Sequence, residues 1–266
     1  TDGGVGISYD KGATWEGIYN MDIGQFYHVT YDMQTPYHVC GGLQDNYTWC
    51  GPSQVRSRTG IGNDEWRQIQ GGDGFEALVD PKDPRTVYAE SQNGNIVRMD
   101  RLTGERKSIR PISLRGEPPL RWNWNTPIVM SPHDSNTIYV AANKVFKSTD
   151  RGQNWTAISP DLTENVVRET LTLMGVTAKE FKVAKHDGVQ SYGNLVQLAE
   201  STTQAGVLFA GADDGTVHMT KDGGATWTNI TNKFPGIPKN AYVSRLVPSV
   251  HDTNTVYATF DNHGND

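Results

Sequence analysis

Short apolar stretches alternate with tight polar turns along most of this chain. In the clearest example, apolar runs at 127–130, 137–142 and 145–148 precede another run that begins at Trp155. Strand-length runs that reverse through Gly, Pro, Asn and Asp are typical of antiparallel β-sheet. The pattern therefore predicts an all-β fold of four-stranded antiparallel units, with one or two helical turns expected only around 165–185.

The same order of strands and turns recurs, which indicates a repeat protein. The predicted units are a half unit at 1–19, complete units at 20–70, 71–120, 121–160 and 161–231, and a half unit at 232–266. An insertion at about 160–192 is expected to lie as a loop over one face. The half units either join to close a five-unit ring or mark a segment of a larger structure. The second arrangement is favoured, because a natural chain seldom starts or stops inside a repeat.

An eight-residue signature, Ser/Thr-x-Asp-x-Gly-x-x-Trp, occurs three times, beginning at Ser8, Ser148 and Thr220. Each Asp is expected to fold back onto backbone amides, each Gly to take a positive φ, and each Trp to begin the next strand. These structural positions are Asp10, Gly12 and Trp15; Asp150, Gly152 and Trp155; and Asp222, Gly224 and Trp227. The Trp side chains, with Trp66 in the same position of its unit, are expected to pack against their own or a neighbouring unit.

The signature resembles the Asp-box, or bacterial neuraminidase repeat, of sialidases, xyloglucanases and sortilin ectodomains. This resemblance implies a β-propeller with four complete blades and two half blades, a segment of a propeller of about seven blades or more. Segments 41–46, 122–127, 159–163 and 211–215 are similar to bacterial proteins labelled sortilin-like or "glycosyl hydrolase, BNR repeat". Those proteins are mostly exported, so the resemblance implies a secreted or periplasmic location and a bacterial origin. It transfers no catalytic residue.

Composition and charge narrow the classes of partner. The chain of 266 residues has 28 Gly, 13 Pro, 7 Trp and 11 Tyr, which favours β structure, and a net charge of −6 with the two signs mixed. No basic stripe is present to neutralise phosphates, so nucleic acid is not expected as a partner. No apolar run is long enough for membrane insertion. No phosphate loop, nucleophile triad or CxxC pair is present, and neither a cofactor nor a metal is expected.

Several acids and histidines are better explained as turn formers than as ligands. Asp83, Asp134 and Asp252 recur at one repeat position, and His133 and His251 at another, so they should point to separate places. The two cysteines, Cys40 and Cys50, flank a hairpin-like stretch. Strands pairing about a turn at 45–46 would bring the sulfurs opposite each other, so a disulfide and two reduced thiols both remain open. A disulfide would indicate an oxidising compartment.

Candidate chemistry lies in the connections from the fourth strand of one unit to the first strand of the next, here called the rim. Its candidate ligand-binding residues are Tyr27, Trp122, Asn123, Trp124, Asn125, Tyr192, Tyr242 and Arg245, and its candidate catalytic acids are Asp22, Asp73, Glu76 and Asp187. Aromatic faces beside amides and carboxylates suit glycans or peptides. Glycoside hydrolysis needs two carboxyls about 5–9 Å apart, and no spacing here singles out a pair.

Sialidase activity is not expected, because the one segment similar to its Phe-Arg-Ile-Pro element is 109–111, outside the rim. The sequence favours an extracytoplasmic binding or interaction module for a glycan, a peptide or other subunits of an assembly. The alternative is a carbohydrate-active glycoside hydrolase that uses rim carboxylates.

Overall fold

A computed structural model describes residues 5–18, 24–173, 176–180 and 191–262. The prediction of an all-β fold with four-stranded antiparallel units is confirmed. The described strands are β1 (Val5–Ile7) and β2 (Glu16–Ile18); β3 (Phe26–Tyr31), β4 (His38–Leu43), β5 (Thr48–Pro52) and β6 (Arg67–Gln70); β7 (Gly74–Val79), β8 (Thr86–Ser91), β9 (Asn95–Asp100) and β10 (Arg106–Ser108); β11 (Ile128–Met130), β12 (Ile138–Ala141), β13 (Val145–Ser148) and β14 (Thr156–Ala157); β15 (Thr172–Leu173) and β16 (Val176–Thr177); β17 (Leu195–Glu200), β18 (Leu208–Ala212), β19 (Val217–Thr220) and β20 (Thr228–Asn229); and β21 (Tyr242–Pro248) and β22 (Val256–Asp261).

Four of the sheets have four strands in simple up-and-down order: the first sheet (β3–β6), the second (β7–β10), the third (β11–β14) and the fourth (β17–β20). The hairpins β1–β2, β15–β16 and β21–β22 form two-stranded sheets. Short 3₁₀ helices are η1 (Asn63–Glu65), η2 (Gln92–Gly94), η3 (Arg168–Thr170) and η4 (Thr231–Lys233). The described part of the 160–192 insertion therefore contains one 3₁₀ turn and a short hairpin.

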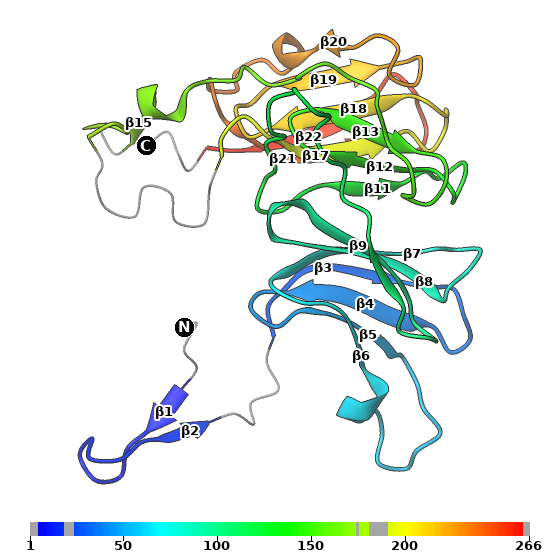
Figure 1. Cartoon of the computed structure of the whole chain (residues 1–266), viewed down its shortest axis with the longest axis vertical. Coiled ribbons are helices and arrows are strands. Elements are labelled where there is room, and N and C mark those ends of the chain that lie inside the picture. The colour runs from blue at the N-terminus through cyan, green and yellow to red at the C-terminus, as the bar shows by residue number, and fades with distance from the viewer. Residues whose placement is uncertain (1–4, 19–23, 174–175, 181–190, 263–266) are drawn as a thin grey trace.

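The apolar core lies between the sheets. Figure 1 shows the four four-stranded sheets following one another along the long axis of the molecule in chain order. Apolar side chains of the second and third sheets form one cluster, which includes Tyr88 on β8 and Ile138 on β12, and the third and fourth sheets share another. The middle strands β8, β12 and β18 are buried along their whole length, because a sheet lies over each face. Burial of both faces explains why their sequences read as continuous apolar runs.

The turn chemistry follows the sequence repeat. Asp134 accepts hydrogen bonds from the amide of Asn136 and the hydroxyl of Thr137. The same turn recurs before β22, where Asp252 accepts from the hydroxyl of Thr255 at 2.7 Å. The prediction that these aspartates form turns is confirmed.

The signature aspartates and glycines also behave as expected. Asp150 Oδ1 accepts the backbone N–H of Asn154 at 2.8 Å, and this bond is the main reason why the pKa of Asp150 falls to about 2. Asp10 and Asp222 accept equivalent bonds and have equally lowered pKa values of about 2. The three signature glycines have φ values of 92°, 80° and 101°. At such angles a side chain would be strained, so glycine is required.

Two signature tryptophans join neighbouring sheets. The indole N–H of Trp155 donates to the carbonyl oxygen of Ile109 at 2.6 Å, and that of Trp227 donates to Ile158 at 2.7 Å. Each acceptor directly follows the last strand of the preceding sheet. The expectation of packing is wrong for Trp15, which is 70% exposed. The described residues contain no sheet that precedes the β1–β2 hairpin, so this indole has no equivalent acceptor.

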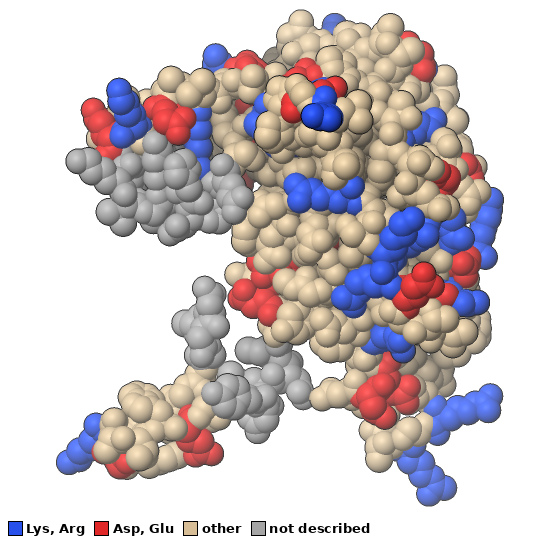
Figure 2. All heavy atoms as spheres, in the orientation of Figure 1, with Lys and Arg blue, Asp and Glu red and all other residues tan. Residues whose placement is uncertain are grey.

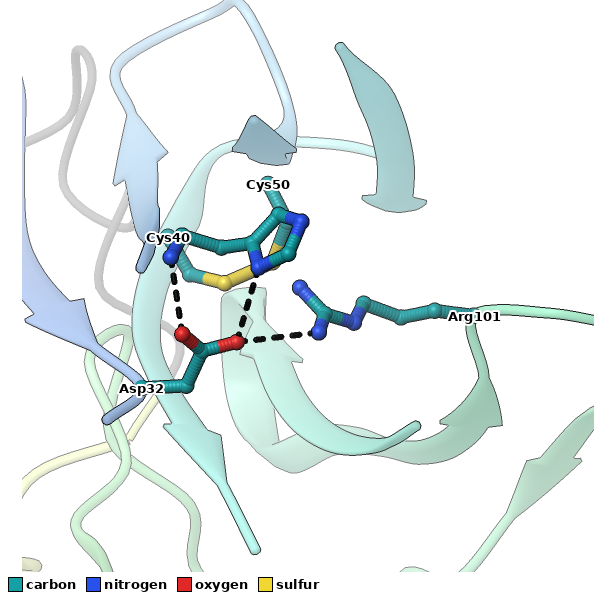
Figure 3. Close-up of a disulfide and its surroundings, with 5 residues drawn as sticks. Asp32, Cys40, Cys50 and Arg101 are labelled. Carbon is teal, nitrogen blue, oxygen red and sulfur yellow. Dashed lines mark hydrogen bonds and ion pairs between the residues drawn. A yellow bond between two sulfur atoms is a disulfide. The ribbon is translucent and has the colours of Figure 1, made fainter. Parts of the chain in front are cut away.

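Cys40 on β4 and Cys50 on β5 form a disulfide (Figure 3). The two residues are directly opposite in the strand register, which is why their sulfurs meet. Nearby, the buried carboxylate of Asp32 accepts from Arg101 and contacts the His38 ring, both at 3.0 Å. Burial alone would raise the pKa of Asp32, but the amides and cations around it hold the pKa below its usual value. Because Arg101 follows β9, this ion pair ties the second sheet to the first.

Candidate binding site

A cavity of about 370 Å³ lies where the first strands of the sheets meet. Its walls come from β3, β7, β11, β17 and β21, which are the first strands of four complete sheets and of the β21–β22 hairpin. The middle of the cavity is apolar, with Leu78, Ile128 and Leu198 among its lining residues. Polar side chains line the rest of the wall, so the cavity offers both stacking surface and hydrogen-bonding groups.

One group of polar residues in the wall contains a histidine, a carboxylate and an arginine. Nδ1 of His28 lies 3.1 Å from Oε1 of Glu76. Burial raises the pKa of Glu76, and the charges of His28 and Arg245 act in the opposite direction. Asn125 lines the same cavity. The structure thus brings together three residues that the sequence singled out, Glu76, Asn125 and Arg245, and adds His28.

A second carboxyl, which the sequence interpretation missed, is buried beside this group. Glu90 on β8 has no exposed surface, and neither of its oxygens has a hydrogen-bond partner among the described residues. Burial, followed by the nearby charge of Glu76, raises the pKa of Glu90 well above its usual value. Burial thus favours the neutral, protonated form of Glu90 over the charged one. The available signal was a glutamate in the apolar strand 86–91, at the position where the third sheet has Ala141.

The candidate acid Asp73 connects two sheets. It is 8% exposed, and its Oδ1 accepts the backbone N–H of Asp45 in the β4–β5 turn at 2.8 Å. Tyr27 lies close by and packs its ring against Phe75, with centroids 4.6 Å apart. Burial and the charges of Asp73 and Asp45 raise the pKa of Tyr27. This geometry gives Asp73 a role in holding the rim connection to the neighbouring hairpin.

The two other rim tyrosines gather around a different buried acid. Tyr192 and Tyr242 are half-buried, and burial followed by the charge of Asp213 raises the pKa of both, that of Tyr242 to about 12. Burial also raises the pKa of Asp213 to about 7, although the amides of Gly193 and Asn194 donate to its carboxylate. Both tyrosines therefore lie near Asp213, which is in the β18–β19 turn, and neither lines the cavity.

The expectation that Trp122 offers its ring to a ligand is wrong. Trp122 is only 5% exposed and belongs to the core between the second and third sheets. Its ring covers Gly94, where any side chain would overlap it, and the Arg110 guanidinium lies 5.0 Å from the ring centroid. Trp124 is half-buried, and Asn123 accepts the backbone N–H of Asn125 within the same connection. The residues of this connection therefore serve mainly to pack the second sheet against the third.

The candidate acids Asp22 and Asp187 lie outside the described residues. Within the described ranges, no group of three or more His, Cys, Asp or Glu side chains is arranged to hold a metal ion. The helices found there are all too short or too polar to span a membrane. On the face shown in Figure 2, Lys and Arg gather over the middle of the molecule with Asp and Glu among them.

The sequence matches no protein-family model and no curated protein. The structure is similar to the extracellular domain of a one-component system from B. thetaiotaomicron, with a TM-score of 0.54 and 11% sequence identity. The match covers 93% of this chain and 28% of that chain. At this level of identity the likeness concerns the fold, and it agrees with an all-β architecture of antiparallel sheets.

Proposed function

We propose that this chain is an extracytoplasmic binding or interaction module on an Asp-box propeller scaffold, which engages a glycan, a peptide or a partner subunit. The observation that carries the proposal is the cavity bordered by all five first strands, with Glu76, His28 and Arg245 in its wall. Equivalent strands around one cavity are what a propeller requires of its blades. The four-stranded sheets, their equal strand order and the structural likeness support the same scaffold.

The disulfide supports an extracytoplasmic location, since disulfides persist in oxidising compartments outside the cytoplasm. The similar solved structure is itself an extracellular domain, which is consistent with this assignment.

The polar wall suits a ligand that carries both hydrogen-bond donors and acceptors. Arg245 is exposed, and no carboxylate of the described residues lies within ion-pair distance of it. Its guanidinium is therefore available to a ligand oxygen. Glu76 accepts from a hydroxyl or amide when it is ionised. Apolar neighbours such as Leu78 and Ile128 supply surface for a sugar ring or an aliphatic side chain. These groups fit hydroxyl-rich glycans and polar peptides.

The hydrolase alternative receives less support from the same residues. Glu76 faces the cavity, but Glu90 beside it is fully enclosed and Asp73 is bound to the Asp45 amide. Neither of these two carboxyls therefore supplies the second group that glycoside hydrolysis requires. Glu200, which also lines the cavity, accepts hydrogen bonds from the Tyr139 hydroxyl and the Gly206 amide. The binding function is accordingly the one we propose.

The test is a screen on glycan and peptide arrays, followed by titration calorimetry of each hit with Glu76→Gln and Arg245→Gln. Removing a charged hydrogen-bond partner of a bound ligand should weaken binding by at least about tenfold. Arg58→Gln is the matched control, because Arg58 is an exposed arginine that does not line the cavity. Equal affinities for all four proteins, or no hit on either array, would contradict the proposal.

A further inference from the structure

Four of the five first strands contain a β-bulge near their beginning, where the pairing with the second strand skips a residue. We call the skipped residue the bulge residue; it is Tyr27 in β3, Val196 in β17 and Ser244 in β21. In β7 the equivalent place holds Phe75 and Glu76, which together lie opposite Glu90. A bulge bends its strand and redirects the neighbouring side chain, and bulges are common next to active sites.

The bulge changes which residues of a strand share a face. In a regular strand, residues two positions apart point to the same side. Leu195 and Leu198 of β17 are three positions apart, yet they belong to the same apolar cluster. Val243 and Leu246 of β21 have the same spacing and share another cluster. The additional position therefore lets each strand keep both apolar contacts and still direct one polar side chain elsewhere.

The residue that follows each bulge residue lines the cavity. These residues are His28 in β3, Gln197 in β17 and Arg245 in β21, and Glu76 lines the cavity from the corresponding place in β7. All four are polar, although the cavity also has apolar lining residues such as Leu78 and Leu198. Four bulges thus place four polar side chains around one cavity.

The bulge residues are anchored by contacts with other parts of the sheets. Tyr27 packs its ring against that of Phe75, with centroids 4.6 Å apart. Val196 is 3% exposed and belongs to the apolar cluster between the fourth sheet and the β21–β22 hairpin. The hydroxyl of Ser244 lies 2.9 Å from that of Thr259. Because the bulge residues are held in this way, the side chains that follow them have a defined direction.

Two of the four polar side chains are available to a ligand. His28 and Glu76 already contact each other, with Nδ1 3.1 Å from Oε1. Among the described residues, neither Gln197 nor Arg245 has a partner for its side chain in a hydrogen bond or an ion pair. Their strands, β17 and β21, lie side by side (Figure 1). The Gln197 amide can donate and accept hydrogen bonds, and the Arg245 guanidinium can donate several.

We propose that the β-bulges direct Gln197 and Arg245 into the cavity, where both side chains contact the ligand, and that Val196 and Ser244 are the positioning residues. This inference rests on the proposed binding function and adds Gln197 to its contacts. The ligand must then present an acceptor oxygen to Arg245 and a second polar group to the neighbouring Gln197. It therefore carries at least two polar groups on one side.

Deletion of Ser244 tests the role of the bulge in β21 without any ligand. It leaves Arg245 in the chain but brings Val243 and Leu246 two positions apart, so a regular strand would keep both in the core and turn Arg245 away from the cavity. In the wild type, the charge of Arg245 lowers the pKa of Glu76 against the effect of burial. NMR titration of protein labelled at the glutamate side-chain carboxyls should therefore show a higher pKa for Glu76 in the deletion variant, as in Arg245→Gln.

Two further variants control this experiment. The exchange Ser244→Arg with Arg245→Ser preserves the length of the chain, so it replaces the deletion variant if circular dichroism shows that the latter does not fold. It moves the guanidinium to the skipped position and should also raise the pKa of Glu76. Ser244→Ala retains the bulge and should leave the pKa of Glu76 as it is in the wild type. A wild-type pKa for Glu76 in the deletion and exchange variants would overturn the positioning role.

The hits of the glycan and peptide arrays test the contact made by Gln197. Gln197→Ala should weaken their binding by about fivefold to tenfold in titration calorimetry, since it removes a hydrogen-bonding partner of the ligand. Its melting temperature should not change, because the side chain has no partner among the described residues. Gln204→Ala is the matched control, because Gln204 is an exposed glutamine of the β17–β18 turn that does not line the cavity. Wild-type affinity of Gln197→Ala for every hit would overturn the assignment of Gln197.

The two readouts separate this inference from the proposed function. Loss of binding in Glu76→Gln and Arg245→Gln, with full binding in Gln197→Ala and in the Ser244 deletion, would leave the proposed function standing and refute the inference. If the arrays give no hit, the proposed function fails and the contact made by Gln197 fails with it. The titration of Glu76 would then still decide whether the bulge directs Arg245 into the cavity.

Discussion

The contact between Trp155 and Ile109 provides a direct measure of what holds neighbouring sheets together. Trp155 is half-buried against the core of the second and third sheets, and its N–H donates to a carbonyl oxygen 2.6 Å away. Trp155→Phe keeps an aromatic ring but leaves that carbonyl unpaired, at a cost of about 1–3 kcal/mol. Trp155→Ala also removes the ring, and the cost should rise to about 3 kcal/mol or slightly more, the low end for a large aromatic because part of the ring is exposed.

Chemical denaturation followed by far-UV circular dichroism measures both changes without relying on tryptophan fluorescence. The matched control is Trp15→Ala, which removes the same side chain from the same signature position at a site that is 70% exposed. Because most of the Trp15 ring is exposed, the control should change the free energy of unfolding by less than about 0.5 kcal/mol. Equal losses at the two positions, or no loss at Trp155, would refute the idea that the contact between Trp155 and Ile109 stabilises the packing of neighbouring sheets.

Three further predictions follow from the buried and hydrogen-bonded groups. Because the pKa of Asp150 is lowered to about 2, its ionised carboxylate contributes stability that is fully present above the usual carboxyl pKa and is lost as the pH falls toward 2. Asp150→Asn should therefore reduce the fall in melting temperature between pH 5 and pH 2, and an unchanged fall would contradict this prediction. Glu90 has the opposite sign: because burial raises its pKa in the folded protein, wild-type stability should fall as pH rises above 4.5. Glu90→Gln should remove that decline, and a pH profile of the melting temperature parallel to that of the wild type would count against a raised pKa for Glu90. Trp122→Ala should lower the free energy of unfolding by about 3–5 kcal/mol in denaturant titrations, because the ring is buried. A variant with unchanged stability but weaker ligand binding would show instead that Trp122 contacts the ligand.

The parts of the fold that local chemistry determines could be predicted from sequence. An aspartate that bonds amides within its own turn, as Asp150 does with Asn154, needs no distant partner. The same is true of Gly152, whose positive φ belongs to the turn itself. Apolar runs likewise predicted the four-stranded sheets, since the middle strands β8, β12 and β18 are covered on both faces by neighbouring sheets.

The candidate site depends on contacts between sheets, which local patterns do not contain. Trp122 lies between Arg121 and Asn123 in a connection, a context typical of an exposed aromatic residue. Gly94 of the preceding sheet, however, leaves space that the Trp122 ring fills. Glu76 could be identified as a rim acid, but its pairing with His28 joins residues 48 positions apart on adjacent first strands. Glu90 could not be identified from the sequence, because the role of a charged residue inside an apolar strand depends on its neighbours in other strands.

The position of the disulfide limits what a reducing agent can do to this molecule. Cys40 and Cys50 are separated by 10 positions and join two adjacent strands of a single hairpin. Closing so short a loop restricts the unfolded chain by about 3 kcal/mol, and it fastens no sheet to another. The boundaries between sheets rest instead on apolar packing and on noncovalent ties such as that of Arg101 to Asp32. Reduction by thiols would therefore destabilise the first sheet alone. Under force or proteolysis, the sheets would separate at the same boundaries as in the oxidised protein.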